Sequence, residues 1–318
     1  MRMRWFIPLI VFAPLSGAVL GAETKPTLLR GTDGRPDLQG IWTSGTLTPY
    51  ERPAHLAGQA HIDPAVVATQ QKAAAERFIA AGHLPNDVGR DNEAFIDHHL
   101  QLLPDGQTSL VIFPLDGKYP IRPEAEKIRD FNLNSADTYE TMSQWDRCIT
   151  REPTALFPVI YNNAYQIVQT ASHVVVHAEM VHDARVVAMS GSHPDTRIRS
   201  WGGDSRGRWD GDTLVVDTTN FNSGGWMATG QNAGRLRGVP YSKDLHIIER
   251  FTPLDRHTLK YEITIDDPQS FTSAFKLSYP LQRDDAYRIY EYACHEGNAA
   301  TEMILRGARV QEVQASDK

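Results

Sequence analysis

Ionisable side chains recur among apolar ones in the strand-like segments of the second half of the chain. In the segment 288–296 (RIYEYACHE), Glu291 and His295 share a face, because successive side chains of a strand point to opposite sides. In LHIIERF, Glu249 shares a face with Ile247 and Phe251 in the same way. A carboxylate or imidazole in an apolar interior has a shifted pKa and can act as an acid or a base. The candidate catalytic residues are therefore His295, Glu291, Glu249 and His182.

These types of residue suggest a division of roles in one site. His295 is expected to be the base, Glu291 its orienting partner, and Tyr290 or Tyr161 a donor to developing charge. Aromatic, amide and acidic side chains suited to a polar rim over an apolar cavity complete the set as expected substrate-binding residues: Tyr161, Asn163, Tyr165, Trp201, Tyr290 and Glu296. The alternative is that these carboxylates form cross-strand ion pairs and the histidines are satisfied side chains.

Motifs of other chemistries are missing from the sequence. There is no HExxH and no paired CxxC, so we predict no metal and no cofactor. There is no GxSxG elbow, which argues against an α/β-hydrolase. The glycine-rich stretch 202–207 lacks the Lys-Ser/Thr of a phosphate-binding loop.

The two cysteines, Cys148 and Cys294, are predicted to form one disulfide. The alternative is a reactive thiol at Cys294. His295 follows it directly, but neighbours on a strand face opposite ways and do not form a Cys–His pair.

The first residues have the character of a targeting segment. Arg2 and Arg4 precede a mostly apolar stretch from Trp5 to Leu20, which predicts a signal peptide over 1–22 with cleavage after Ala22. The stretch is short for a membrane anchor and contains two prolines. We therefore expect a secreted or periplasmic protein with no membrane span after the signal is removed.

Charge excludes several classes of partner. The chain has 32 basic and 39 acidic side chains, and loss of Arg2 and Arg4 leaves 30 and 39, a net charge of −9. Scattered charges without a Lys/Arg cluster argue against nucleic acid and against anionic membrane surfaces. The expected partner is a small hydrophobic or aromatic molecule, and the oligomeric state stays open.

The elements that must position these residues are mainly β. Residues 23–150 are expected to hold an N-terminal strand around 40–42, helices over 63–82 and near 124–129, and irregular segments packed on a barrel. Residues 151–318 contain about nine short alternating runs, which predicts an antiparallel up-and-down barrel with a short helix over 298–309, docked through Met303, Ile304 and Leu305. Asp210-Gly211 suits a two-residue type I′ turn. A β-sandwich is the alternative.

The motifs GRPDLQGIW, GDSRGRWDGDTLVVDTTNF and IYEYACHEGN resemble those of a group of secreted bacterial proteins of uncharacterised function. This resemblance covers almost the whole mature chain and implies a secreted, single-domain, β-rich protein, without implying an activity. Gly40-Ile41-Trp42 and the run of strands more distantly resemble lipocalin-type (calycin-like) barrels, which implies a cavity for a small hydrophobic molecule.

Three functions follow from this reading. The leading hypothesis is a secreted or periplasmic enzyme that performs cofactor-free acid–base chemistry, as an isomerase, lyase, cyclase or hydrolase, on a small hydrophobic or aromatic molecule. The second is a non-catalytic carrier of the same fold. The third is a structural envelope protein with a filled core.

Overall fold

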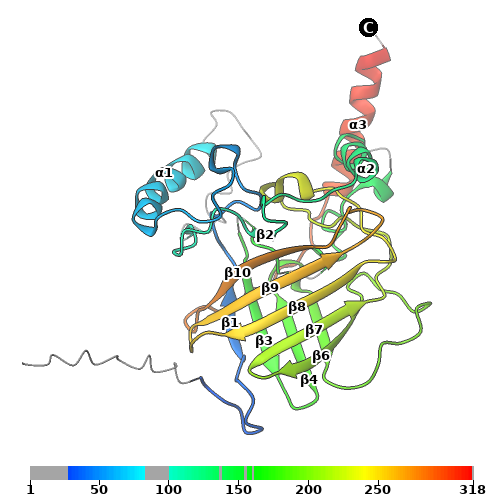
Figure 1. The fold of residues 1–318 in the computed structure, drawn as a ribbon. Coiled ribbons are helices and arrows are strands. Elements are labelled where there is room, and N and C mark those ends of the chain that lie inside the picture. Colours follow the sequence, from blue (N-terminus) through cyan, green and yellow to red (C-terminus); the bar gives the residue numbers. More distant parts are fainter. Residues whose placement is uncertain (1–27, 83–99, 136–137, 154–155, 160, 317–318) are drawn as a thin grey trace, which may run out of the picture.

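A computed structural model describes residues 28–82, 100–135, 138–153, 156–159 and 161–316 (Figure 1). The expected signal peptide at 1–22 lies outside the described residues. The strands are β1 (Gly40–Thr43), β2 (Val111–Phe113), β3 (Ala164–Gln169), β4 (His173–Ala178), β5 (Ala184–Ala188), β6 (Asp204–Asp210), β7 (Thr213–Thr219), β8 (His246–Pro253), β9 (Thr258–Asp266) and β10 (Phe275–Arg283). The longer helices are α1 (Pro64–Gly82), α2 (Pro123–Asn134) and α3 (Ala300–Ser316).

The strands form a closed barrel, as the sequence predicts. The sheet order is β1-β3-β4-β5-β6-β7-β8-β9-β10, and β1 also pairs with β10, so nine strands complete the ring and β2 adds to β10. Closure rules out the β-sandwich alternative. The expectation of a purely antiparallel sheet is wrong at one place, since β5 and β6 pair in parallel. The long connection 189–203 allows this, because a parallel neighbour cannot be reached through a tight hairpin.

The predicted hairpin between β6 and β7 is present, with a different turn. Asp210 pairs with Thr213, so Gly211 and Asp212 are the two turn residues. Gly211 has a φ of +59°, and Asp212 is not among the described residues with positive φ. That pattern is the one of a type II′ turn rather than type I′, which needs positive φ at both positions.

Gly40 and Trp42 lie where the barrel closes. Trp42 pairs with Tyr165 of β3 on one side and with Arg283 of β10 on the other. The Arg283 guanidinium lies 5.7 Å from the centre of the Trp42 ring. Gly40 has a φ of +140°, and a Cβ there would lie 3.1 Å from Arg283 Cζ, so this position requires glycine.

Side chains fill the interior of the barrel. The inward face of β8 alternates with a half-buried outer face and carries Ile247, Glu249 and Phe251. Large inward side chains from other strands pack with it, each at most 2% exposed: Trp42, Tyr165, Tyr261 and Tyr279. Leu110 and Tyr119 of the N-terminal half belong to the same core cluster, so both halves of the chain share one core.

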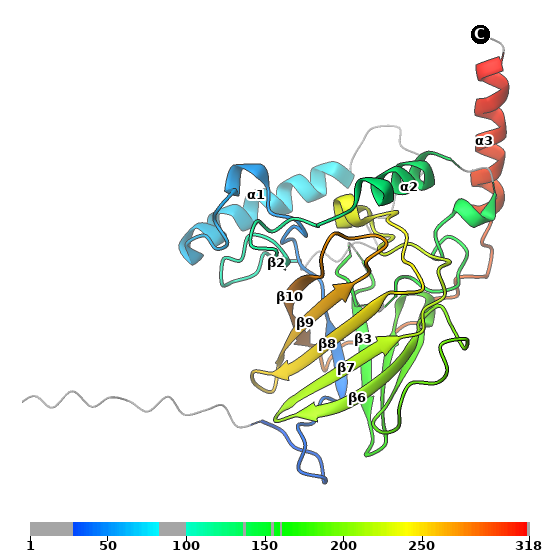
Figure 2. The same ribbon diagram turned by 45° about the vertical axis from the view of Figure 1, so that its right-hand side comes forward.

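The helices lie outside the barrel. In both views α1 and α2 lie beyond one end of it, and α3 extends away from it (Figures 1 and 2). The sequence predicts all three helices, but the docking expected for the last one is wrong. Met303 is 68% and Ile304 37% exposed, and none of the described residues of α3 is buried.

Candidate functional site

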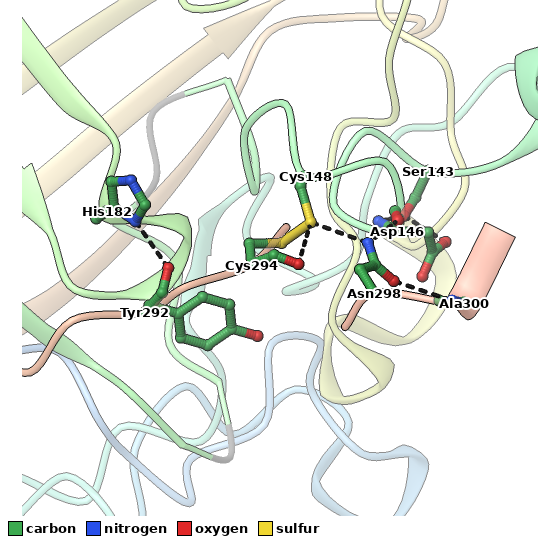
Figure 3. Close-up of a disulfide and its surroundings, with 8 residues drawn as sticks. All are labelled: Ser143, Asp146, Cys148, His182, Tyr292, Cys294, Asn298 and Ala300. Atoms are coloured by element: carbon green, nitrogen blue, oxygen red, sulfur yellow. Dashed lines mark hydrogen bonds between the residues drawn. A yellow bond between two sulfur atoms is a disulfide. The ribbon is translucent and has the colours of Figure 1, made fainter. Parts of the chain in front are cut away.

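A disulfide between Cys148 and Cys294 lies at the rim of the barrel, outside its interior (Figure 3). It confirms the predicted pairing, with the two Cα atoms 5.6 Å apart. The bond attaches the extended segment 284–299, here called the C-terminal segment, to the turn around residues 143–148. Asn298 strengthens this attachment, because its Nδ2 donates to the Asp146 carbonyl (3.3 Å) while its Oδ1 accepts from the Ala300 N–H (2.9 Å) and so caps α3.

An open cleft of about 450 Å³ lies beside this disulfide. We call it the rim cleft. Aromatic, acidic and small residues from the two disulfide-linked segments line it: Trp145, Asp146, Glu291, Tyr292, Ala293, Cys294, Asn298 and Ala300. Among the described residues, this lining contains two acidic and two aromatic residues and no Lys, Arg or His.

Backbone strain gathers around the same rim. Four residues other than glycine have positive φ there: Cys148 (54°), Asn162 (52°), Val181 (66°) and His182 (41°). A β-branched residue such as Val181 is a genuine outlier in this region of φ, and each such residue costs about 1–3 kcal/mol. Strain of this kind persists only where the surrounding structure fixes it, and it is enriched at functional sites.

Glu179, which is fully buried, fixes the C-terminal segment to the barrel. Its two carboxylate oxygens accept hydrogen bonds from the Tyr287 hydroxyl at 3.0 and 2.8 Å, and one of them accepts from the Tyr290 N–H at 3.3 Å. The Asn162 side chain also donates to Glu179. This carboxylate is therefore occupied by structural partners, and it positions the segment that forms one wall of the rim cleft.

His182 lies exposed at the same rim with its ring held in place. Its Nδ1 lies 2.7 Å from the carbonyl oxygen of Tyr292 (Figure 3). A carbonyl only accepts, so Nδ1 carries a proton, and in the neutral ring Nε2 is the unprotonated nitrogen. The neighbouring Tyr161 side chain is hydrogen-bonded to Tyr292. Burial is the main cause that raises the pKa of Tyr161, and its interaction with Tyr292 raises this pKa further.

The strand expected over residues 288–296 is wrong. This stretch has no regular strand, and Glu291, His295 and Glu296 are exposed. The physical reason is that β10 already pairs with β9 on one side and with β1 and β2 on the other, so neither edge of β10 is free to pair with the strand that would follow it. Glu291 still lines the rim cleft, whereas His295, Glu296 and Tyr290 do not.

Four other predicted site residues have structural partners instead. Glu249 is fully buried, makes a two-pronged ion pair with Arg185 of β5, and accepts from the Tyr261 hydroxyl at 2.8 Å. The Asn163 side chain bonds both backbone groups of Val159, at 2.7 and 2.8 Å.

The remaining two also have structural neighbours. Tyr165, 1% exposed, lies in the core with its hydroxyl 3.4 Å from Ser44 Oγ. Trp201 lies under the Arg147 guanidinium, 5.2 Å from the ring centre. The predicted residues thus do not form one interior site. Of these residues Glu291 lines the rim cleft, and Tyr161 and His182 contact its lining residue Tyr292.

Sequence reasoning missed a buried ion pair at Arg151 and Glu152. Both residues are 1% exposed, and their side chains approach to 3.3 Å. Burial raises the pKa of Glu152 to about 7, although the Arg151 charge lowers it. Arg151 Nη1 and Glu152 Oε2 have no hydrogen-bond partner among the described residues. Two adjacent charged residues in an irregular stretch are normally predicted to be exposed, so the sequence gives no indication that this pair is buried.

Sequence reasoning also missed a connected set of histidine and carboxylate side chains on the outer face of the barrel. His193 Nδ1 lies 2.6 Å from Asp204, and its Nε2 lies 3.1 Å from Asp217, which His246 Nε2 approaches to 3.1 Å as well. Burial alone would raise the pKa of Asp204, but hydrogen bonds from Arg206 and His193 hold it below its ordinary value.

Comparisons with known proteins assign no family or function to this site. No protein-family model, curated protein or solved structure matches the chain. Among the described residues, no group of three or more His, Cys, Asp or Glu side chains is arranged to hold a metal ion. Within the same residues, no helix combines the length and apolar character needed to cross a membrane.

Proposed function

We propose that this protein binds a small, partly aromatic molecule in the rim cleft and acts as a carrier. The observation that supports this most is the cleft itself, with Trp145 and Tyr292 among its lining. Its volume of about 450 Å³ lies within the range of roughly 300–1,000 Å³ typical of small-molecule pockets. The barrel interior is a poorer candidate, because core side chains and the Arg185–Glu249 pair occupy it.

The walls of the cleft are held in place before any ligand arrives. The disulfide joins them covalently, Asn298 bonds across to Asp146, and Glu179 anchors the C-terminal segment. Pre-organised walls favour binding, since little conformational entropy is lost when the ligand enters.

A fragment screen by ligand-observed NMR tests this proposal. We expect aromatic fragments to bind the wild type and to lose binding in Trp145→Ala. Tyr290→Ala is the matched control, because Tyr290 is 70% exposed on the C-terminal segment but does not line the cleft. Fragment binding that Trp145→Ala leaves unchanged and Tyr290→Ala abolishes would contradict the assignment.

One observation favours the enzyme alternative. The Tyr292 carbonyl fixes the His182 tautomer and leaves Nε2 as an acceptor, which is the state that a general base requires. In that case His182, which does not line the cleft but bonds the lining residue Tyr292, replaces His295 as the base. Turnover of a fragment found in the screen should then fall about 10²-fold or more in His182→Gln, with binding retained. Equal rates in both proteins would leave the carrier function.

Export from the cytoplasm is part of the same proposal. The disulfide supports it, since structural disulfides persist in oxidising compartments. Mass spectrometry of the mature protein should find an N-terminus near residue 23, and an exported protein that keeps Met1 would contradict the predicted cleavage.

A further inference from the structure

We infer that the ligand of the rim cleft is a small organic cation, such as a protonated or quaternary amine with an aromatic or apolar body. This inference rests on the proposed function of the cleft and adds the chemical class of its ligand. The charge of the lining, the contacts of the neighbouring Arg147 and the aromatic residues of the cleft each support it.

The charge of the lining is negative without a balancing base. Asp146 and Glu291 supply two carboxylates, and none of the described residues that line the cleft is Lys, Arg or His. Glu291 is exposed and has no hydrogen-bond or ion-pair partner among the described residues. Asp146 accepts from Ser143 Oγ at 2.6 Å through Oδ2 (Figure 3). An anionic ligand would meet two like charges here, whereas a cation gains from both.

The base that follows Asp146 in the sequence is committed elsewhere. Arg147 lies over the Trp201 ring, and its guanidinium donates to the carbonyls of Ser143 (3.3 Å) and Gly224 (3.1 Å). Burial lowers the pKa of Arg147, with only partial compensation from nearby acidic groups. The Asp146 charge is one of these groups, but Arg147 forms no ion pair with Asp146 or Glu291 among the contacts of the described residues.

The aromatic surface selects an organic cation over a metal ion. Trp145 and Tyr292 line the cleft, and aromatic faces attract alkylammonium groups as well as apolar bodies. A metal ion prefers several oxygen or nitrogen ligands at short range. No such group of three or more acidic, histidine or cysteine side chains exists among the described residues.

Three probes that share a benzyl or phenyl body test the class: benzylamine, which is protonated at pH 7, benzyl alcohol and benzoate. We expect NMR titration to show benzylamine binding about tenfold more tightly than benzyl alcohol, and benzoate binding most weakly. Glu291→Gln should weaken benzylamine about three- to tenfold and leave benzyl alcohol unchanged, as suits an exposed charge pair. Added salt should weaken benzylamine alone.

Glu296→Gln is the matched control, since Glu296 is an exposed carboxylate on the same segment that does not line the cleft. It should leave all three affinities unchanged. Benzyl alcohol binding as tightly as benzylamine, with both sensitive to Trp145→Ala, would overturn the cation class and keep the proposed function. If no probe and no screened fragment bound in a Trp145-dependent way, both proposals would fail.

Discussion

The interior of the barrel and its disulfide-bonded rim use the same types of residue in opposite ways. In the interior, Glu249 is fully buried and every observed contact of its carboxylate is with Arg185 or Tyr261. At the rim, Glu291 is exposed beside an open cleft and has no such partner among the described residues. A carboxylate with committed partners holds a fold together, whereas an uncommitted one beside a cleft can meet a ligand. Burial and partners, rather than residue type, therefore distinguish the two regions.

The largest expected effect comes from removing the disulfide, which tests how far the rim depends on it. Cys148→Ser/Cys294→Ser opens a loop of 146 residues, and loss of this constraint on the unfolded chain should cost about 5 kcal/mol. The barrel strands do not contain either cysteine, so the β-sheet circular dichroism should persist below the new melting temperature. Urea unfolding measures the loss, and a double variant as stable as wild type would show that the rim does not need the bond.

Glu249→Gln should have the next largest effect. It leaves the Arg185 guanidinium, whose side chain is only 10% exposed, without a counter-charge in the interior. Breaking a buried pair in this way costs about 3–5 kcal/mol. The double variant Arg185→Met/Glu249→Leu should recover much of the loss, because it removes both charges together. If urea unfolding showed additive losses instead, the pair would not be the main source of the effect.

Glu152→Gln tests how a second buried carboxylate makes the stability of the protein depend on pH. Burial raises its pKa from 4.5 to about 7, so the folded state holds a proton that the unfolded chain releases between these values. The stability contributed by this group is complete below pH 4.5 and is lost as pH rises through about 7. From pH 4.5 to 8 the wild type should therefore lose about 3 kcal/mol more than the variant. Parallel stability curves from urea melts at each pH would refute this origin, and Glu296→Gln provides the control.

The sequence predicts the strands well because side-chain alternation is a local property. It places Glu249 between Ile247 and Phe251 on one face of β8, and all three are buried together. The same rule fails over 288–296, where alternation is present but every neighbouring edge of β10 is occupied. Whether an alternating segment becomes a strand depends on a free partner, which local pattern does not show.

The site is less predictable than the fold, because its contacts join distant parts of the chain. Glu179 and Tyr287 are 108 residues apart in the sequence, and His182 and Tyr292 are 110 residues apart. Only the disulfide could be foreseen, since two cysteines allow one pairing. Arg151 and Glu152, and the partners of His193, depend on packing between segments whose positions the sequence leaves open.

The smallest effect on stability is expected for Glu291→Gln, and it completes the comparison with Glu249→Gln. Both substitutions replace a carboxylate by its uncharged isostere, so any difference between them reflects the surroundings alone. Glu291 is exposed and without a partner among the described residues, so the change in unfolding free energy should stay within about 0.5 kcal/mol. Binding of a cationic probe at the rim cleft should nevertheless weaken, because Glu291 lines it. Urea unfolding and NMR titration of the same protein preparation separate these two quantities. A loss of stability near that of Glu249→Gln would mean that Glu291 is a structural carboxylate, and the distinction between interior and rim would not hold.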